Sequence, residues 1–294
     1  MSSSPSLLAV APPSPLQQFR RFGLRVTDLS DQLWCEQRLA LSLARGKEET
    51  PEMKQGKERH QALHEEITEI VRVRPETRAD IWLLHFFNAW AALVQLQQQG
   101  ICREIPVFGY LGELWVVGVI DQVQSNEDHR LVLSDTKTRK KPSLPTLAQK
   151  RTTQLQMMLY HRLWSQLAQK PDPYAVFEAI SLPVDVEASP SFVAQLSEHA
   201  LPSPKPFEML SHTLDAFGEA LPLDSQMFVS YEWQQDHSLL GIDPFSFDSR
   251  WLEQHLCNSL PFWHGERSPL GVSHQDAWKC RFCDFANECP VRPR

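Results

Sequence analysis

Residues 116–137, with the sequence VVGVIDQVQSNEDHRLVLSDTK, decide the fold. Two runs rich in β-branched and apolar residues flank the turn-forming cluster Ser-Asn-Glu-Asp, which is the pattern of two strands joined by a turn. A similar run precedes them, so segments 105–110, 114–123 and 131–137 predict a three-stranded meander. Because side chains alternate along a strand, we expect Asp135 and Lys137 on one face of the last strand.

The segments around this meander are mostly helical in pattern. Apolar spacing predicts helices over 27–43, 51–73, 78–99, 147–167 and 248–263, and strands over 174–182 and 226–233. The aromatic residues of the helix at 78–99 are expected in the core rather than on a surface that stacks a ligand; they are Trp82, Phe86, Phe87 and Trp90. Together these elements indicate an α/β or α+β domain with one mixed sheet flanked by helices.

We expect a single domain over residues 26–294. It divides into an N-terminal helical part (26–100), a core (101–182), an insertion or connector (183–225) and a C-terminal part with clustered cysteines (226–294). The stretch 183–223 is rich in Pro and Ser and has weak periodicity, which is typical of a connector. Residues 1–25 are expected to be a disordered leader, in preference to an organelle transit peptide, and no secretory signal is visible in them.

The composition is that of an ordinary globular protein. Of the 294 residues, 42% are hydrophobic and 22% are charged, which excludes a mainly disordered, collagen-like or disulfide-dense class. The longest apolar run, 81–96, is interrupted by His85 and Asn88 and is shorter than the roughly 20 residues that span a bilayer. We therefore expect no membrane insertion and an intracellular protein.

The charge is unevenly distributed along the chain. The net charge of −7 by itself argues against a polyanionic partner, but residues 136–151 contain six basic and no acidic residues. This run could follow a phosphate backbone, although it could also be an ordinary solvated loop. Its candidate DNA-binding residues are Arg139, Lys140, Lys141, Lys150 and Arg151.

Two carboxylates end neighbouring apolar strands. A charged residue at the end of such a strand is costly to bury unless it is paired or binds a cation. Asp121 and Asp135 together would form a hard oxygen site for Mg²⁺ or Mn²⁺, with Lys137 close enough to steady developing negative charge. A surface hairpin with an Asp–Lys pair is the alternative interpretation.

The cysteines near the C-terminus have the spacing of metal ligands. Cys280-x2-Cys283-x5-Cys289 provides three thiolates, and a four-ligand site needs one more. Cys35 lies in a polar setting, whereas Cys102 and Cys257 lie in apolar surroundings typical of packing. The spacing is compatible with zinc or with a 4Fe-4S cluster and does not choose between them, and six buried thiols are the remaining alternative.

These features resemble the exonuclease V family of RecB-type PD-(D/E)XK nucleases that carry an iron–sulfur cluster. The resemblance is colinear over most of the chain and is weakest over 183–223. It rests on the segments VTDL (26–29), WCE (34–36), REIPVFG (103–109), VGVID (117–121) and DTKTR (135–139), on Gln156 with Tyr160, and on the cysteine segment 277–289.

The resemblance implies a restriction-endonuclease-like core in which Asp121 and Asp135 bind the catalytic metals and Lys137 is the motif lysine. It also implies that an iron–sulfur cluster, held by Cys35, Cys280, Cys283 and Cys289, joins the N- and C-terminal segments. Gln156 and Tyr160, spaced i, i+4 on one helix, resemble the pair that positions the DNA backbone. His60 in Gly56-x3-His60 resembles a further metal ligand, although a solvated histidine also fits. Many relatives have Glu at the position of Asp135, and the motif accepts either residue.

The expected function is metal-dependent hydrolysis of single-stranded DNA from a free end, with a 5′ preference and a role in DNA repair or genome maintenance. A structure-specific endonuclease, a nuclease module of a larger complex and a non-catalytic metal-stabilised DNA-binding module are the alternatives. The resemblance further favours a monomer, a single-strand-binding protein as partner, and a location in the nucleus or cytoplasm, with the mitochondrion as another compartment.

Overall fold

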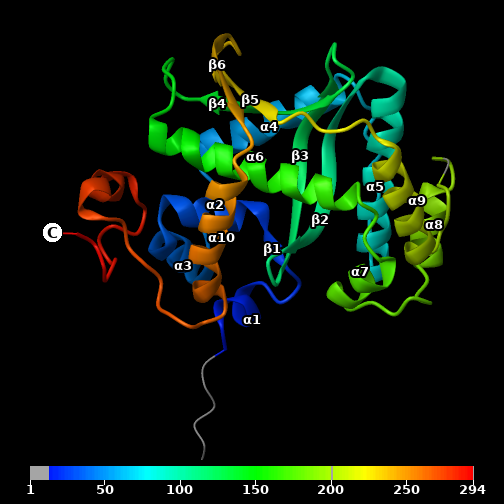
Figure 1. Cartoon of the computed structure of the whole chain (residues 1–294), viewed down its shortest axis with the longest axis horizontal. Helices are drawn as coiled ribbons and strands as arrows, with labels where there is room; N and C mark the ends of the chain where they lie inside the picture. The colour runs from blue at the N-terminus through cyan, green and yellow to red at the C-terminus, as the bar shows by residue number, and fades with distance from the viewer. Residues whose placement is uncertain (1–12, 200, 294) are drawn as a thin grey trace, which may run out of the picture.

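A mixed six-stranded sheet forms the centre of the molecule, and helices cover both of its faces (Figure 1). The computed structural model describes residues 13–199 and 201–293. This arrangement confirms the predicted mixed α/β fold with helices around a mixed sheet. The strands are β1 (Leu24–Arg25), β2 (Ile101–Leu111), β3 (Leu114–Ser125), β4 (Leu131–Arg139), β5 (Gln226–Trp233) and β6 (Leu239–Ser246).

The sheet consists of two parts that are joined at one end of β3. On one edge β3 pairs along its whole length with β2, antiparallel. Its other edge is shared, because β1 pairs with residues 116–117 and β4 pairs only with residues 122–125. From there β4 turns away from β3 and continues beside β5, which it pairs in parallel from Ser134 to Arg139. The sheet is therefore split between β3 and β4, next to Asp121.

The helices begin and end where local sequence signals place them. Helix α5 starts with a capping box between Thr77 and Asp80 and ends at Gly100, whose φ of 73° is a left-handed cap. Helix α6 starts with a capping box between Thr146 and Gln149. The helices are α1 (Pro15–Phe19), α2 (Val26–Trp34), α3 (Glu36–Arg45), α4 (Pro51–Glu65), α5 (Arg78–Gln99), α6 (Leu147–Leu167), α7 (Pro173–Ala179), α8 (Pro190–Leu196), α9 (Pro206–Glu219), α10 (Ser249–Trp263) and the 3₁₀-helix η1 (His274–Phe282).

Helices α5 and α6 lie on opposite faces of the β2–β3 hairpin. A Cβ placed on Gly118 would lie 2.6 Å from the Tyr160 ring of α6, so α6 packs on the face to which Gly118 belongs. Trp82 of α5 contacts Phe108, which belongs to the other face. The β2–β3 hairpin that carries Asp121 therefore lies between two helical layers.

Several sequence expectations are wrong in detail. Segment 174–182 is mostly helix α7 rather than a strand, because Asp172 caps it and Pro173 occupies its first turn. The expected connector 183–223 contains α8 and α9, and α9 packs its apolar face against α5. The expected helix over 27–43 is broken at Cys35 into α2 and α3.

The N-terminal leader also differs from expectation where the structure describes it. Residues 15–19 form α1, and Leu24 of β1 is fully buried against β3. Residues 1–12 of the expected leader lie outside the described residues. Strand β6, which the sequence did not predict, pairs with β5 at the edge of the sheet.

One continuous hydrophobic core joins the sheet to most of the helices, without α4 and η1, and its largest fully buried side chains include Trp164, Trp263 and Phe86. Phe87 is also buried, as expected, whereas Trp82 and Trp90 are only partly buried. Within residues 13–199 and 201–293, no helix is long and apolar enough to cross a membrane.

Candidate active site and cysteine cluster

The split in the sheet brings two carboxylates and a histidine together. Asp121 lies on β3 just before the segment that pairs with β4, and Asp135 lies on β4 just after it. His60 approaches from α4, with its Nδ1 atom 3.6 Å from Oδ1 of Asp121. One ligand atom from each of the three residues lies within 4.8 Å of the other two. The three residues are far apart in the sequence, and they meet because β4 diverges from β3 at this point.

Lys137 extends along the same face of β4 as Asp135. Its Nζ lies 2.7 Å from Oδ2 of Asp135 and 3.9 Å from Oδ2 of Asp121. Burial lowers the pKa of Lys137, but the two carboxylates outweigh this effect and raise it above its usual value. Lys137 is therefore a fixed cation in the site.

The two aspartates are electrostatically unequal. Burial and the neighbouring Asp135 raise the pKa of Asp121 well above its usual value. Burial also opposes ionisation of Asp135, but Lys137 outweighs it, so the pKa of Asp135 is lowered. Burial lowers the pKa of His60, which keeps the imidazole neutral and able to bind a metal.

The residues of this site fit a hard divalent cation. Asp121 Oδ2 and both carboxylate oxygens of Asp135 are buried and accept no hydrogen bond of normal geometry, although the Lys137 ion pair reaches them. Buried carboxylate oxygens without donors are costly unless a cation satisfies them. Two carboxylates with one imidazole are a donor set that suits Mg²⁺ or Mn²⁺.

Gln156 and Tyr160 lie together under the site, on α6. Gln156 Nε2 donates a hydrogen bond of 3.1 Å to the Tyr160 hydroxyl, as their i, i+4 spacing allows. Tyr160 is only 3% exposed, and burial followed by the charge of Asp121 raises its pKa. The phenol therefore stays protonated, and it lies close enough to the carboxylates to feel their charge.

Glu104 is a third acidic residue at the site, and no sequence pattern predicted a role for it. The register pairs Arg103 with Gln122 and Ile105 with Ile120, which places Glu104 opposite Asp121. Its φ of 55° is uncommon for a residue other than glycine. Burial and the Asp135 charge raise the pKa of Glu104. Two carboxylates on facing strand positions repel each other, which again favours a cation between them.

A cavity of about 910 Å³ opens onto these groups, and α4 and the β4–β5 region form its walls. His60, Glu104, Asp121 and Lys137 all line it. It is large enough for a ligand of nucleotide size, because ligand cavities typically occupy roughly 300–1,000 Å³.

The basic residues expected to bind DNA do not form one continuous free surface. Lys150 Nζ lies 2.7 Å from Oδ1 of Asp243 on β6, and Lys140 pairs with Glu52 at the cavity wall. Lys141 and Arg151 are exposed, and Arg139 is partly buried with its Nε directed to the Ser143 carbonyl oxygen. Lys150 is therefore neutralised within the fold, whereas Lys141 and Arg151 are directed to solvent.

The four cysteines expected to bind a cluster come together from the two ends of the chain. Cys35 lies at the break between α2 and α3, and Cys280, Cys283 and Cys289 lie in or after η1; all four line one small cavity. Burial and then the three C-terminal thiols raise the pKa of the Cys35 thiol. The other two cysteines lie elsewhere. Cys102 is buried in β2, where burial raises its pKa to about 12, and Cys257 is exposed on α10.

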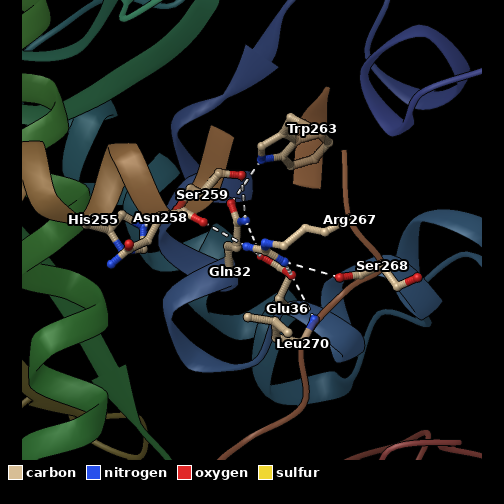
Figure 2. Close-up of polar contacts among 9 residues, drawn as sticks. All are labelled: Gln32, Glu36, His255, Asn258, Ser259, Trp263, Arg267, Ser268 and Leu270. Atoms are coloured by element: carbon tan, nitrogen blue, oxygen red, sulfur yellow. Dashed lines mark hydrogen bonds and ion pairs between the residues drawn. The ribbon is translucent and has the colours of Figure 1, made fainter. Parts of the chain in front are cut away.

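A buried polar network holds these two chain ends in place (Figure 2). Glu36, the residue after Cys35, is 7% exposed and accepts hydrogen bonds from Arg267 and from the Leu270 amide, the latter at 2.8 Å. Gln32 donates to Glu36 and accepts a 2.9 Å hydrogen bond from the indole of Trp263. In Figure 1 the C-terminal segment lies beside α3. The network thus fixes the entry of that segment next to Cys35.

Comparisons with known proteins show which proteins the chain is similar to. Residues 14–130, 123–216 and 205–292 match the family described as "Exonuclease V - a 5' deoxyribonuclease". The chain is 31% identical over 293 residues to Exonuclease V of Danio rerio, which covers 95% of this chain and 73% of that protein. A solved structure described as "Crystal structure of SSO0001" matches with a TM-score of 0.44 and 13% identity, over 92% of this chain and 87% of that one.

The family match spans nearly the whole chain and includes both the split sheet and the cysteine segment. The resemblance found in the sequence is thereby confirmed. The chain belongs to the exonuclease V family, whose members are 5′ DNA exonucleases.

Proposed function

We propose that the chain is a divalent-metal-dependent nuclease with a PD-(D/E)XK centre that removes nucleotides from the 5′ end of single-stranded DNA. The observation that carries this proposal is the convergence of Asp121, Asp135 and Lys137 at the split between β3 and β4. Carboxylate oxygens without donors beside a fixed ammonium suit metal-assisted hydrolysis better than a purely structural role.

Each residue has a part that follows from its position. A divalent ion held by Asp121, Asp135 and His60 would lower the pKa of water and neutralise charge on the phosphate. Lys137 is placed to hold the attacking water or a phosphate oxygen, because it is fixed between the two carboxylates. Glu104, opposite Asp121, is a further acidic group that can orient water.

The position of the site supports a single strand as the substrate. The Asp135 side chain is fully buried, so a phosphate must enter deeply between α4 and the sheet to reach it. A single strand bends into such a cavity more easily than a duplex does. Exposed Lys141 and Arg151 provide positive charge near the site that does not depend on DNA sequence.

We also propose that Cys35, Cys280, Cys283 and Cys289 bind a 4Fe-4S cluster rather than one zinc ion. Zn–S bonds of about 2.3 Å keep any two ligands of one ion within about 4.6 Å of each other. Among the described residues, only His60, Asp121 and Asp135 form a group of three or more metal-ligand atoms within 4.8 Å, so no three cysteine sulfurs are that close. This wider spacing supports a larger group that spans the four sulfur atoms.

The test of the nuclease proposal uses anaerobically purified protein with single strands labelled at the 5′ or the 3′ end. We expect Mg²⁺-dependent release of the 5′ label in short products, and survival of circular strands. Asp121→Asn should abolish cleavage and leave strand binding intact, while Asp128→Asn, at an exposed position in the β3–β4 turn, serves as the matched control. Intact strands with wild-type protein would indicate a binding module, and cut circles an endonuclease; either result overturns the proposal.

The cluster proposal has its own measurement. We expect a brown protein with broad absorption near 400 nm, about four iron atoms and four sulfides per chain, and little zinc. A colourless protein with one zinc ion per chain contradicts it. A monomeric state, a single-strand-binding partner, a role in DNA repair and the compartment stay predictions from the sequence.

A further inference from the structure

A second cavity lies beside the active site. It has a volume of about 310 Å³ and lies between α5 and the β2–β3 hairpin, near the start of α2. Trp82 and His85 of α5 form one wall, Phe108 and Val119 belong to the strands, and Tyr160 is at the side of the active site. Most of this lining is apolar, so the cavity suits a flat, weakly polar group rather than a phosphate or a metal ion.

This cavity adjoins the catalytic one. Thr27, exposed at the start of α2, lines both cavities. Tyr160 lines the second cavity and interacts with the charges of Asp121 and Asp135 at the metal site. Both cavities adjoin the stretch of β3 between Val117 and Gln122, where β1 has ended and β4 has not yet paired. The apolar cavity therefore lies next to the split in the sheet, and Val119 in its lining is two residues along β3 from Asp121.

The side chains of the second cavity favour a planar heterocycle. The ring centroids of Trp82 and His85 lie 5.4 Å apart, and Trp82 is only partly buried although it packs on the core residue Phe86. Burial lowers the pKa of His85, so its imidazole is neutral and does not attract a phosphate away from the metal site. Exposed Arg25 lines the same cavity and provides a positive charge for the backbone that carries the heterocycle.

We propose that this cavity holds one unpaired nucleobase of the DNA strand, next to the phosphate that is cleaved. The inference rests on the proposed nuclease function and adds the part of the substrate that the metal site does not contact. A base in a duplex cannot enter, because its pairing partner lies beside it in the same plane and its stacked neighbours cover both of its faces. Stacking also accepts every base, since each has a π face, so the cavity selects single strands without selecting sequence.

The first test changes the substrate and leaves the protein unaltered. A set of single strands, each with one abasic site at a different distance from the 5′ end, is cleaved by the wild-type protein in single-turnover assays. We expect KM to rise about tenfold at one position and to change little at the others, because one stacked base is lost. If KM is the same for every position of the abasic site, and the unmodified strand is cleaved normally, the base-pocket proposal is wrong. If the unmodified strand is not cleaved, the nuclease proposal itself fails.

The second test uses matched variants of one helix. Trp82→Leu removes the wall of the cavity, whereas Trp90→Leu removes a partly buried tryptophan of the same helix that stacks on Phe87, 6.0 Å away, outside the cavity. We expect Trp82→Leu to cleave intact strands as poorly as strands with an abasic site. Trp90→Leu should show the same rise in KM with an abasic site as the wild-type protein. His85→Ala is the second pocket variant, in case Trp82→Leu unfolds, and it should reduce the effect. An abasic effect that is undiminished in a folded pocket variant overturns the proposal.

Discussion

Arg267→Ala should destabilise the protein far more than loss of an ordinary surface ion pair. Arg267 donates to both carboxylate oxygens of Glu36, one bond at 3.0 Å, and also to the Asn258 carbonyl oxygen at 2.7 Å. Glu36 is 7% exposed, so the substitution leaves a buried carboxylate that retains only its bonds from Gln32 and Leu270 (Figure 2).

The magnitude follows from this burial. Removing one partner of a buried ion pair costs about 3–5 kcal/mol. The Arg267 side chain is 27% exposed and Glu36 keeps two donors, so a value of about 3 kcal/mol is appropriate. At about 2–4 °C per kcal/mol, the melting temperature should fall by roughly 6–12 °C.

The assay is thermal unfolding followed by circular dichroism, with absorption of the cysteine-bound group recorded on the same samples. Arg45→Ala is the matched control, because Arg45 also joins α3 to the C-terminal segment, through Glu288. That pair is exposed, at 49% and 45%, and is expected to contribute less than about 1 kcal/mol. The double variant Glu36→Leu/Arg267→Met should regain much of the stability, because no buried charge is left unpaired. Equal melting temperatures for Arg267→Ala and Arg45→Ala would refute the reasoning.

Four further changes test other parts of the molecule. Lys137→Ala should lower kcat by about 10²–10³-fold with little change in the affinity for single strands, measured by single-turnover kinetics and fluorescence anisotropy. Cys283→Ser should give a protein without the cluster absorption and with a lower melting temperature, seen in spectra and unfolding curves. Gly118→Ala would place a Cβ 2.6 Å from the Tyr160 ring and should cost about 1–3 kcal/mol in urea unfolding, with slower cleavage. Burial lowers the pKa of His255, so below about pH 6.5 the unfolded chain takes up a proton that the folded chain resists; stability should fall as the pH drops, and less so in His255→Gln.

Each of these outcomes has a defined contradiction. Undiminished turnover in Lys137→Ala would exclude its role in the site. Cys257→Ser is the control for the cluster, because Cys257 is exposed on α10, and equal loss of colour in both serine variants would exclude the assigned ligands. Wild-type stability of Gly118→Ala would show that α6 does not pack as described. An unchanged pH dependence in His255→Gln would place the acid sensitivity elsewhere.

Local sequence signals determined the strands and helices that carry the site. Alternation placed Asp135 and Lys137 on one face of β4, and in the structure Lys137 Nζ lies 2.7 Å from Oδ2 of Asp135. Helix α6 begins and ends at the predicted residues, so the i, i+4 pair Gln156 and Tyr160 is in contact as expected. These features depend on residues that are close together in the sequence, within one helix or one strand. Sequence patterns are informative over this range.

The same local reasoning failed where tertiary packing decides the structure. Segment 174–182 contains β-branched and aromatic residues, yet its capped start and its packing beside α9 make it helix α7. The connector at 183–223 has weak periodicity, but α9 buries Met209, Leu214 and Phe217 against the core. Burial of an apolar helix face outweighs a weak helix propensity, and the sequence of the segment alone does not identify the face that it packs against.

Sequence alone predicted the candidate residues for the chemistry: the acidic strand ends, the lysine two residues after Asp135 and the cysteines with metal-ligand spacing. Only the tertiary structure decided how the carboxylates meet, because β4 leaves β3 beside Asp121 and His60 of α4 lies at the same place. It also placed Glu104 opposite Asp121 and neutralised Lys150 with Asp243. These contacts depend on strand register and on the packing of elements that are distant in sequence. They contribute to stability only when the whole sheet has formed.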